Sequence, residues 1–223
     1  GWMGVEKLDW WDRNAPLPHN CNRQFTWNES REIVLNAYYD FEPGMAETAR
    51  LFFDNGWIDA PPREGKNPGA FAHPTVPSAH PYVLLNFHGK SRDVMTLAHE
   101  LGHGVHQVLA SKLGPLLSDT PLTLAETASV FGEMLTFQKL LGKTENDQER
   151  KVLIASKIED MINTVVRQIS FYKFERLVHT NRANGELTSD NINALWLETQ
   201  ENSLGPGIKF HEQYKYLWAY IPH

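Results

Sequence analysis

The sequence has little of what marks a secreted, membrane-spanning or nucleic-acid-binding protein. Cys21 is the single cysteine among 223 residues, which excludes an internal disulfide and a metal site built from cysteines. No apolar stretch approaches the roughly 18 residues that a membrane-spanning helix needs, and no secretory signal is visible. Lysine and arginine form no run and the net charge is −6, so nucleic acid is not an expected partner. The composition favours a globular protein of the cytoplasm.

What the sequence does contain is the motif His99-Glu100-Leu101-Gly102-His103. Two histidines four residues apart lie on one face of a helix and can share a zinc ion, while the glutamate between them can reach a zinc-bound water. With 10 histidines in the chain, random order would give only about 0.03 matches to this pattern. The flanking residues are apolar, and unpartnered polar groups are costly in such surroundings. A surface helix that carries two histidines by chance is the alternative.

The next predicted helix, which opens at Thr120-Pro121, offers a third zinc ligand. Glu126 and Glu133 are seven residues apart and therefore share one face of that helix. Both lie among apolar or small residues, where a carboxylate is usually paired or bound to a metal. We interpret Glu126 as the ligand and Glu133 as an acceptor that orients a ligand histidine. An ordinary salt bridge is the alternative for Glu133.

His106 lies on the same helical face as the motif histidines. It is about 10.5 Å along the helix from His99, which is too far for both to bind one ion comfortably. We interpret His106 as a residue that supports a ligand, faces the substrate, or simply lies in the core.

Three segments resemble the oligoendopeptidase F family, which belongs to the thimet-oligopeptidase-like zinc peptidases. They are TLAHELGHGVHQ (96–107), LAETASVFGE (124–133) and HPYVLLNF (80–87). The resemblance covers nearly the whole chain, from residue 10 to residue 223. It implies that His99, His103 and Glu126 bind one zinc ion per chain, and that Glu100 is the catalytic base.

The resemblance also suggests how this chain relates to a complete enzyme. In the family, a segment similar to residues 218–223 continues into a tyrosine-rich stretch that binds substrate and stabilises the oxyanion. By this resemblance His223, the last residue, has a catalytic role. We expect residues 1–223 to form part of a single metallopeptidase catalytic domain, without the family's N-terminal helical region and without its tyrosine-rich segment.

The predicted fold is mainly α-helical, a multi-helical zincin-type catalytic domain with a small β-sheet beside the helix of the zinc motif. Helices are expected at residues 29–40, 44–55, 91–112, 122–141, 147–183 and 189–202. The segment 147–183 has one long amphipathic pattern. Residues 61–81 contain six prolines and are predicted to be a loop.

A short strand is predicted from Tyr82 to Phe87, where β-branched and aromatic residues gather. Its edge is a candidate for binding an extended peptide as an added strand, because main-chain hydrogen bonds tolerate many sequences. His80 and Tyr82 are accordingly candidate substrate contacts. An ordinary core strand is the alternative.

The expected function is zinc-dependent hydrolysis of internal bonds in short oligopeptides. Glu100 would take a proton from the zinc-bound water as it attacks the scissile carbonyl, and would then pass it to the leaving amine. Two alternatives stay open. One is a zinc carboxypeptidase of similar helical architecture, and the other is a fragment that binds zinc or peptide without turnover.

Overall fold

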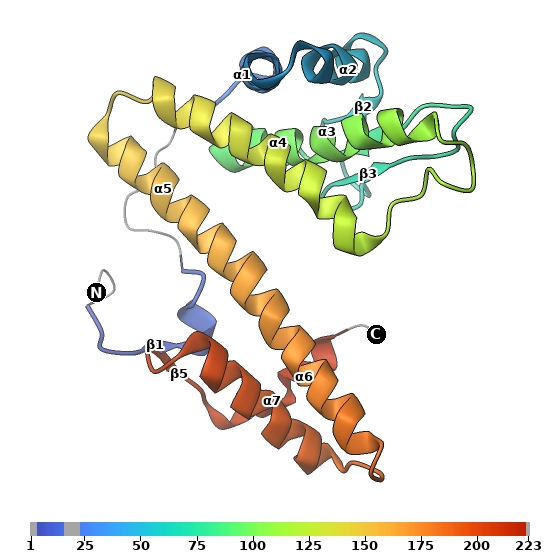
Figure 1. The fold of residues 1–223 in the computed structure, drawn as a ribbon. Helices are drawn as coiled ribbons and strands as arrows, with labels where there is room; N and C mark the ends of the chain where they lie inside the picture. Colours follow the sequence, from blue (N-terminus) through green and yellow to red (C-terminus); the bar gives the residue numbers. More distant parts are fainter. Residues whose placement is uncertain (1–3, 16–22, 222–223) are drawn as a thin grey trace. The chain divides into compact units, whose positions relative to one another are not determined.

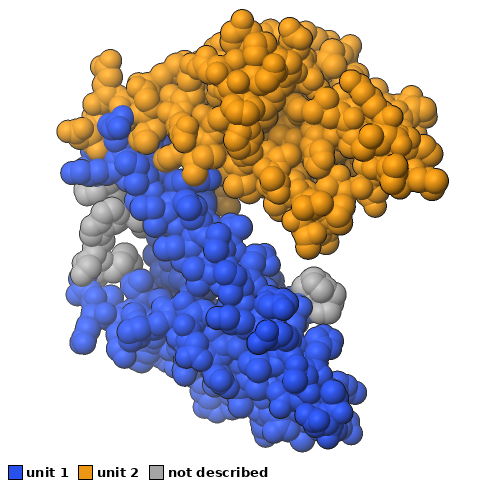
Figure 2. Space-filling model, in the orientation of Figure 1, with its two compact units in different colours: residues 1–20, 148–223 blue, residues 21–147 orange. Residues whose placement is uncertain are grey.

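The computed structural model describes residues 4–15 and 23–221 and is mainly helical, with small sheets, as the sequence predicts (Figure 1). These residues form two units, which Figure 2 shows in different colours. The central unit comprises residues 21–147, and the terminal unit comprises residues 1–20 and 148–223. Within the described ranges, none of the helices combines the length and the apolarity that a membrane crossing requires.

Four helices build the central unit, and α3 packs against the other three. They are α1 (Trp27–Phe41), α2 (Pro43–Asp54), α3 (Ser91–Ser111) and α4 (Leu122–Lys143). The core between them contains fully buried side chains from α1, α2 and α3, among them Tyr38, Phe52, Leu97 and Leu101. Burial of this apolar surface holds α3 in place, and α3 carries the motif His99–His103.

Capping hydrogen bonds explain where these helices begin. Thr26 and Glu29 form a capping box at the start of α1, in which each side chain accepts a backbone N–H of the other residue. Glu42 caps α2, and Pro43 occupies its first turn. At the start of α3, the Asp93 carboxylate accepts two backbone N–H groups. The observed helices match the predicted ranges within a few residues.

The sheet of the central unit differs from the prediction in two respects. The strands are β2 (Ile58–Asp59), β3 (Phe71–His73) and β4 (Tyr82–Leu84), in the order β2-β4-β3. β3 lies inside the segment that was predicted to be a loop, because three residues between prolines carry no local strand signal. The candidate edge role of the strand at Tyr82 is wrong as well, and the alternative of a core strand holds, since β4 is parallel to β2 on one side and antiparallel to β3 on the other. Strand order depends on pairing between distant residues, which the local sequence does not reveal.

The outer strand β3 is covered by α3 rather than open. Gln107 donates to the carbonyl oxygen of Ala72 at 3.3 Å, and the backbone of Ala72 lies near enough to the Glu100 carboxyl group to lower its pKa. The carbonyl oxygen of Ala72 is therefore used within the chain.

A buried ammonium group fixes the connection that follows β2. The side chain of Lys66 is only 2% exposed, and Nζ donates to one carboxylate oxygen of Asp59 at 3.1 Å. The same nitrogen donates to the carbonyl oxygens of Asp59, Pro61 and Leu85 at 2.7–3.0 Å. These bonds compensate for the removal of the charge from water.

The terminal unit contains a long helical segment and the helix that follows it. Its helical elements are η1 (Trp10–Asp12), α5 (Asp147–Met161), the π-helical turn η2 (Ile162–Val166), α6 (Arg167–Arg182), α7 (Ser189–Leu204) and η3 (Glu212–Tyr220). A parallel pair joins β1 (Leu8–Asp9) to β5 (Ile208–Lys209). The core of this unit consists of Phe174, Trp196 and Tyr214, with half-buried apolar residues around them.

The amphipathic pattern of 147–183 predicts the helical segment but not its burial. The helix is continuous through the π turn, which the sequence did not indicate. Phe174 is 5% exposed and lies in the core, whereas Ile158, Ile162, Val165 and Ile169 are 48–53% exposed. The periodic apolar residues therefore cover the core only at the α6 end.

Candidate metal centre

Helix α3 presents the two motif histidines side by side. The ring centroids of His99 and His103 are 5.0 Å apart, with an edge-to-face angle of 81°. Both residues are half-buried, while Val94, Leu97 and Leu101 on the opposite face are fully buried. The apolar face thus anchors the helix and leaves the histidines directed away from the core.

Helix α4 brings Glu126 to these histidines. Its Oε2 atom lies 3.2 Å from Nε2 of His99 and 3.6 Å from Nε2 of His103. One ligand atom from each of the three residues lies within 4.8 Å of the others. A tetrahedral zinc ion with bonds of 2.0–2.1 Å would separate its ligand atoms by about 3.3–3.4 Å. The donor set and the measured separations therefore fit a zinc ion.

The predicted burial of Glu126 is wrong. The side chain of Glu126 is 60% exposed, and its neighbours Leu122 and Leu124 are 88% and 59% exposed. The reason is that α4 buries only a narrow face. The buried residues on this face are Ser129, Gly132, Thr136 and Leu140.

The second nitrogen of His99 faces another carboxylate. Nδ1 of His99 lies 3.2 Å from Oε2 of Glu133, whose side chain is 15% exposed. A carboxylate only accepts hydrogen bonds, so a hydrogen bond here requires a proton on Nδ1. In the neutral tautomer that carries this proton, Nε2 has a free lone pair on the side of Glu126, as a metal ligand requires.

Glu100 lies in different surroundings from the other two carboxylates. It is 6% exposed, and its Oε2 atom is buried without a hydrogen-bond partner among the described residues. Burial is the main reason why the pKa of Glu100 is raised to about 7, and the negative charge of Glu126 contributes to the increase. The charge of His99 and the backbone of Ala72 act in the opposite direction and lower this pKa. A carboxyl group of this kind can both accept and release a proton near neutral pH.

The two histidines respond differently to the same environment. Burial lowers the pKa of His103, partly against the attraction of Glu126. Burial also opposes the charged form of His99, but its hydrogen bond to Glu133 and the charges of three carboxylates raise its pKa overall. Three glutamates around two imidazoles make the site attractive to a cation.

Close packing of α3 against α4 sets this geometry. A Cβ atom at Gly102 would lie 2.6 Å from the carbonyl oxygen of Ala128 and 2.7 Å from the Cα of Ser129. Only glycine therefore permits the observed approach at that point. Nearby, the Tyr38 hydroxyl donates to the carbonyl oxygen of Ala98 at 2.5 Å, which ties α1 to α3.

Sequence analysis missed two contributors to the site. The hydroxyl of Ser129 donates to Oε2 of Glu126 at 2.8 Å. The three-residue spacing of Glu126 and Ser129 on a helix could have indicated this contact. Gly102 was noted only as part of the motif, and nothing local marks it as a contact point for another helix.

The remaining candidate residues do not join the group of ligands. His106 is half-buried, and its side chain forms no hydrogen bond with another described residue. The ring of His80 stacks on Trp57, with centroids 4.0 Å apart and planes at 6°, and Tyr82 follows at 4.6 Å. His223 lies outside the described residues.

The chain is similar to known peptidases. The family model "Peptidase family M3" matches residues 44–223. The chromosomal oligoendopeptidase F of Lactococcus lactis subsp. cremoris is 31% identical over 99% of this chain, and the match covers 37% of that protein. Oligopeptidase PepF of Bacillus subtilis is 27% identical over 99% of the chain, which covers 33% of its length. The chain thus spans about a third of the length of these relatives.

Solved structures show the same fold. The crystal structure of a Chlamydophila abortus protein assigned as a peptidase matches 99% of this chain and 37% of that one, with a TM-score of 0.82 and 27% identity. The oligoendopeptidase-F of Enterococcus faecium matches the whole chain and 32% of its own, with a TM-score of 0.66 and 21% identity. The family model matches residues 44–223, which is most of the sequence, and shows that the chain belongs to peptidase family M3.

Proposed function

We propose that this chain is part of a single catalytic domain of a zinc-dependent endopeptidase that hydrolyses internal bonds of short oligopeptides. The observation that carries the proposal is the meeting of three ligand atoms, from His99, His103 and Glu126, beside the buried carboxyl group of Glu100. Membership of family M3 and similarity to proteins named oligoendopeptidase F support a peptidase that acts on oligopeptides. The compartment we propose is the cytoplasm.

His99, His103 and Glu126 are the proposed zinc ligands, one ion per chain. A zinc ion bound there would act as a Lewis acid that acidifies a water molecule and polarises the scissile carbonyl. Glu133 keeps the proton of His99 on Nδ1, so that Nε2 is available to the metal.

Glu100 is the proposed general base. Its unpartnered Oε2 can take a proton from the attacking water, and the same oxygen can deliver that proton to the leaving amine. No other described residue needs to supply a proton.

For the substrate we propose an oligopeptide that contacts His223 and one or more of His106, His80 and Tyr82. We do not place it as an added strand on β3, because the carbonyl oxygen of Ala72 already accepts a hydrogen bond from Gln107 of α3. The exposed face beside Glu126 leaves the metal ligands open to solvent and to a peptide.

Elemental analysis of the purified chain, without added metal, tests the proposed metal site. About one zinc per chain, lost in His103→Ala, is the expected result. A folded chain without metal would contradict the assignment of Glu126.

Peptide cleavage then tests the reaction. An oligopeptide blocked at both ends should be cut internally by an endopeptidase, whereas a carboxypeptidase needs a free C-terminus. Zinc binding without any cleavage would favour a non-catalytic binding role.

A further inference from the structure

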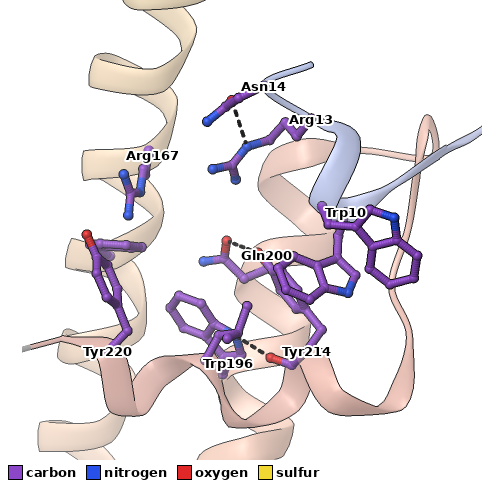
Figure 3. Close-up of a pocket in the computed structure, with 11 residues that line it drawn as sticks. Trp10, Arg13, Asn14, Arg167, Trp196, Gln200, Tyr214 and Tyr220 are labelled. Atoms are coloured by element: carbon purple, nitrogen blue, oxygen red, sulfur yellow. Dashed lines mark hydrogen bonds between the residues drawn. The ribbon is translucent and has the colours of Figure 1, made fainter. Parts of the chain in front are cut away.

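A second candidate site lies in the terminal unit, formed entirely by residues of that unit. It is a half-open pocket of about 340 Å³, between η1, α6, α7 and η3 (Figure 3). This volume is at the small end of the range of ligand pockets, about 300–1,000 Å³. A ligand of roughly one or two amino-acid residues would fill it.

Two arginines line this pocket, Arg13 and Arg167. Figure 3 shows both guanidinium groups on the same side, above the amide of Gln200. Neither forms an ion pair with a carboxylate in the described part of the chain: Arg13 has one long hydrogen bond to Asn14, at 3.5 Å, and Arg167 lies over the rings of Phe171 and Tyr220. Burial raises the pKa of Tyr214. The positive charges of Arg13 and Arg167 both act against this increase, so both guanidinium groups lie near the Tyr214 hydroxyl.

The polar groups at the floor of the pocket are already satisfied. The indole N–H of Trp196 donates to the carbonyl oxygen of Tyr214 at 3.0 Å. The Tyr214 hydroxyl donates to Gln200 at 3.1 Å, and the amide of Gln200 donates to the Ser170 hydroxyl at 2.5 Å. These four residues are at most 5% exposed, so their positions are fixed by packing as well as by bonding. The two guanidinium groups are therefore the charged groups left for a ligand, and the indole N–H of Trp10 in the same lining is buried without a hydrogen-bond partner among the described residues.

The walls of the pocket are largely aromatic. Trp10, Phe171, Trp196 and Tyr220 contribute rings around the same space. Trp10 is itself held edge-on against Tyr214, with ring centroids 5.2 Å apart. Rings of this kind bind a flat or branched apolar group, whereas guanidinium groups bind a carboxylate through paired N–H donors.

We propose that this pocket binds the free C-terminal residue of a peptide whose last side chain is apolar or aromatic. Arg13 and Arg167 hold the carboxylate, and the aromatic walls hold the side chain. The choice of a peptide as the carrier rests on the proposed function. The preference for a carboxylate on an apolar body rests on the pocket alone.

The test measures binding of acetyl-Gly-Gly-Phe, with a free or an amidated C-terminus, to the full chain. Zinc is first stripped with phenanthroline and the chelator is dialysed away, so that no metal can hold the carboxylate. Calorimetry gives the affinity, and tryptophan fluorescence reports on Trp10 and Trp196 in the pocket. The free acid should bind at least about tenfold more tightly than the amide, because loss of a charge-assisted bond costs roughly that factor.

Arg167→Met and Arg13→Met should each weaken binding of the free acid about tenfold and leave binding of the amide nearly unchanged. Arg176→Met is the matched control, because Arg176 lies on the same helix as Arg167 and over a ring, that of Tyr172, outside the pocket. Circular dichroism verifies folding, and Arg13→Gln replaces Arg13→Met if that variant unfolds.

Equal affinity for acid and amide, or no effect of either arginine variant, would overturn the proposal. Binding of N-acetylphenylalanine but not of the tripeptide would overturn the assignment to a peptide. None of these outcomes depends on zinc or on cleavage. A chain that cuts no peptide can still pass this test, so the two proposals can fail separately.

Discussion

The hydroxyl of Ser129 donates to Oε2 of Glu126, the same oxygen that lies 3.2 Å from Nε2 of His99. Ser129 is fully buried, whereas the side chain of Glu126 is 60% exposed. A buried donor thus holds an exposed carboxylate in the orientation that faces both histidines.

Replacing Ser129 with alanine should lower zinc affinity by about tenfold, the lower end of the effect expected for residues that orient a metal ligand. Competition with a metal chelator of known affinity measures this. Thr127→Ala, which removes an exposed hydroxyl from the same helix, is the control and should leave affinity unchanged. Equal affinities in the two variants would show that Ser129 does not position Glu126.

Glu100→Gln should retain zinc and lower kcat by about 10²–10⁴-fold, because the amide cannot accept the proton of the attacking water. Glutamine has nearly the same volume, so packing around this buried residue is preserved. Metal analysis and turnover of an end-blocked peptide are measured on the same sample. Wild-type turnover would eliminate Glu100 as the base.

Glu133→Ala should weaken zinc binding by roughly 10–100-fold, because the proton of His99 loses its acceptor. Glu133→Gln keeps an oxygen acceptor at nearly the same place and should have a smaller effect. Affinities are compared at fixed pH and ionic strength. If both variants bind zinc like the wild type, Glu133 forms an ordinary ion pair instead.

Gly102→Ala should destabilise the chain by about 1–3 kcal/mol, because the new methyl group overlaps with the backbone of α4. It should also weaken zinc binding, since Glu126 is displaced together with that helix. Gly142→Ala is the matched control on α4, where nothing lies within 4 Å of an added Cβ. Urea unfolding gives both stabilities. A loss of the same size in both variants would refute the packing explanation.

The pair of Asp59 and Arg63 predicts an acid-sensitive contribution to stability. Hydrogen bonds from Arg63 lower the pKa of Asp59 from its ordinary 3.8 to about 2, and Lys66 contributes to this decrease. Burial acts in the opposite direction. The unfolded chain therefore takes up this proton first, so the stabilisation is present above pH 4 and disappears as the pH falls toward 2. Asp59→Asn should be less stable than wild type at neutral pH, with a difference that shrinks across this window. Asp119→Asn, at an exposed position, is the control for urea unfolding at each pH.

Much of the central unit could be predicted from local sequence. Capping residues such as Thr26, helix-starting prolines such as Pro43 and apolar periodicity mark where α1 to α4 begin and end. The zinc motif predicted its own geometry, because four-residue spacing on a helix determines the positions of two side chains. The proximity of Glu126 to the two histidines was expected because its helix could be located from the sequence; its role as a ligand stays a prediction.

What escaped prediction depends on contacts between distant residues. The strand order that places β4 in the middle, and the approach of α4 to Gly102, arise only when separate elements meet. The exposure of Glu126 was mispredicted for the same reason, since apolar neighbours in sequence are not always neighbours of the core. The pocket of the terminal unit is a further case, because Arg13 and Arg167 are far apart in the chain.

The unequal exposure of the proposed ligands has a kinetic consequence. His99 and His103 are attached to a helix held on its apolar face, whereas Glu126 reaches the site from the solvent side. Rotation of an exposed side chain takes picoseconds to nanoseconds, far less than the separation of two packed helices. We therefore expect metal to enter and leave by detachment of Glu126 alone, so that the rate of exchange with a chelator is governed by one hydrogen bond, from Ser129, rather than by unfolding.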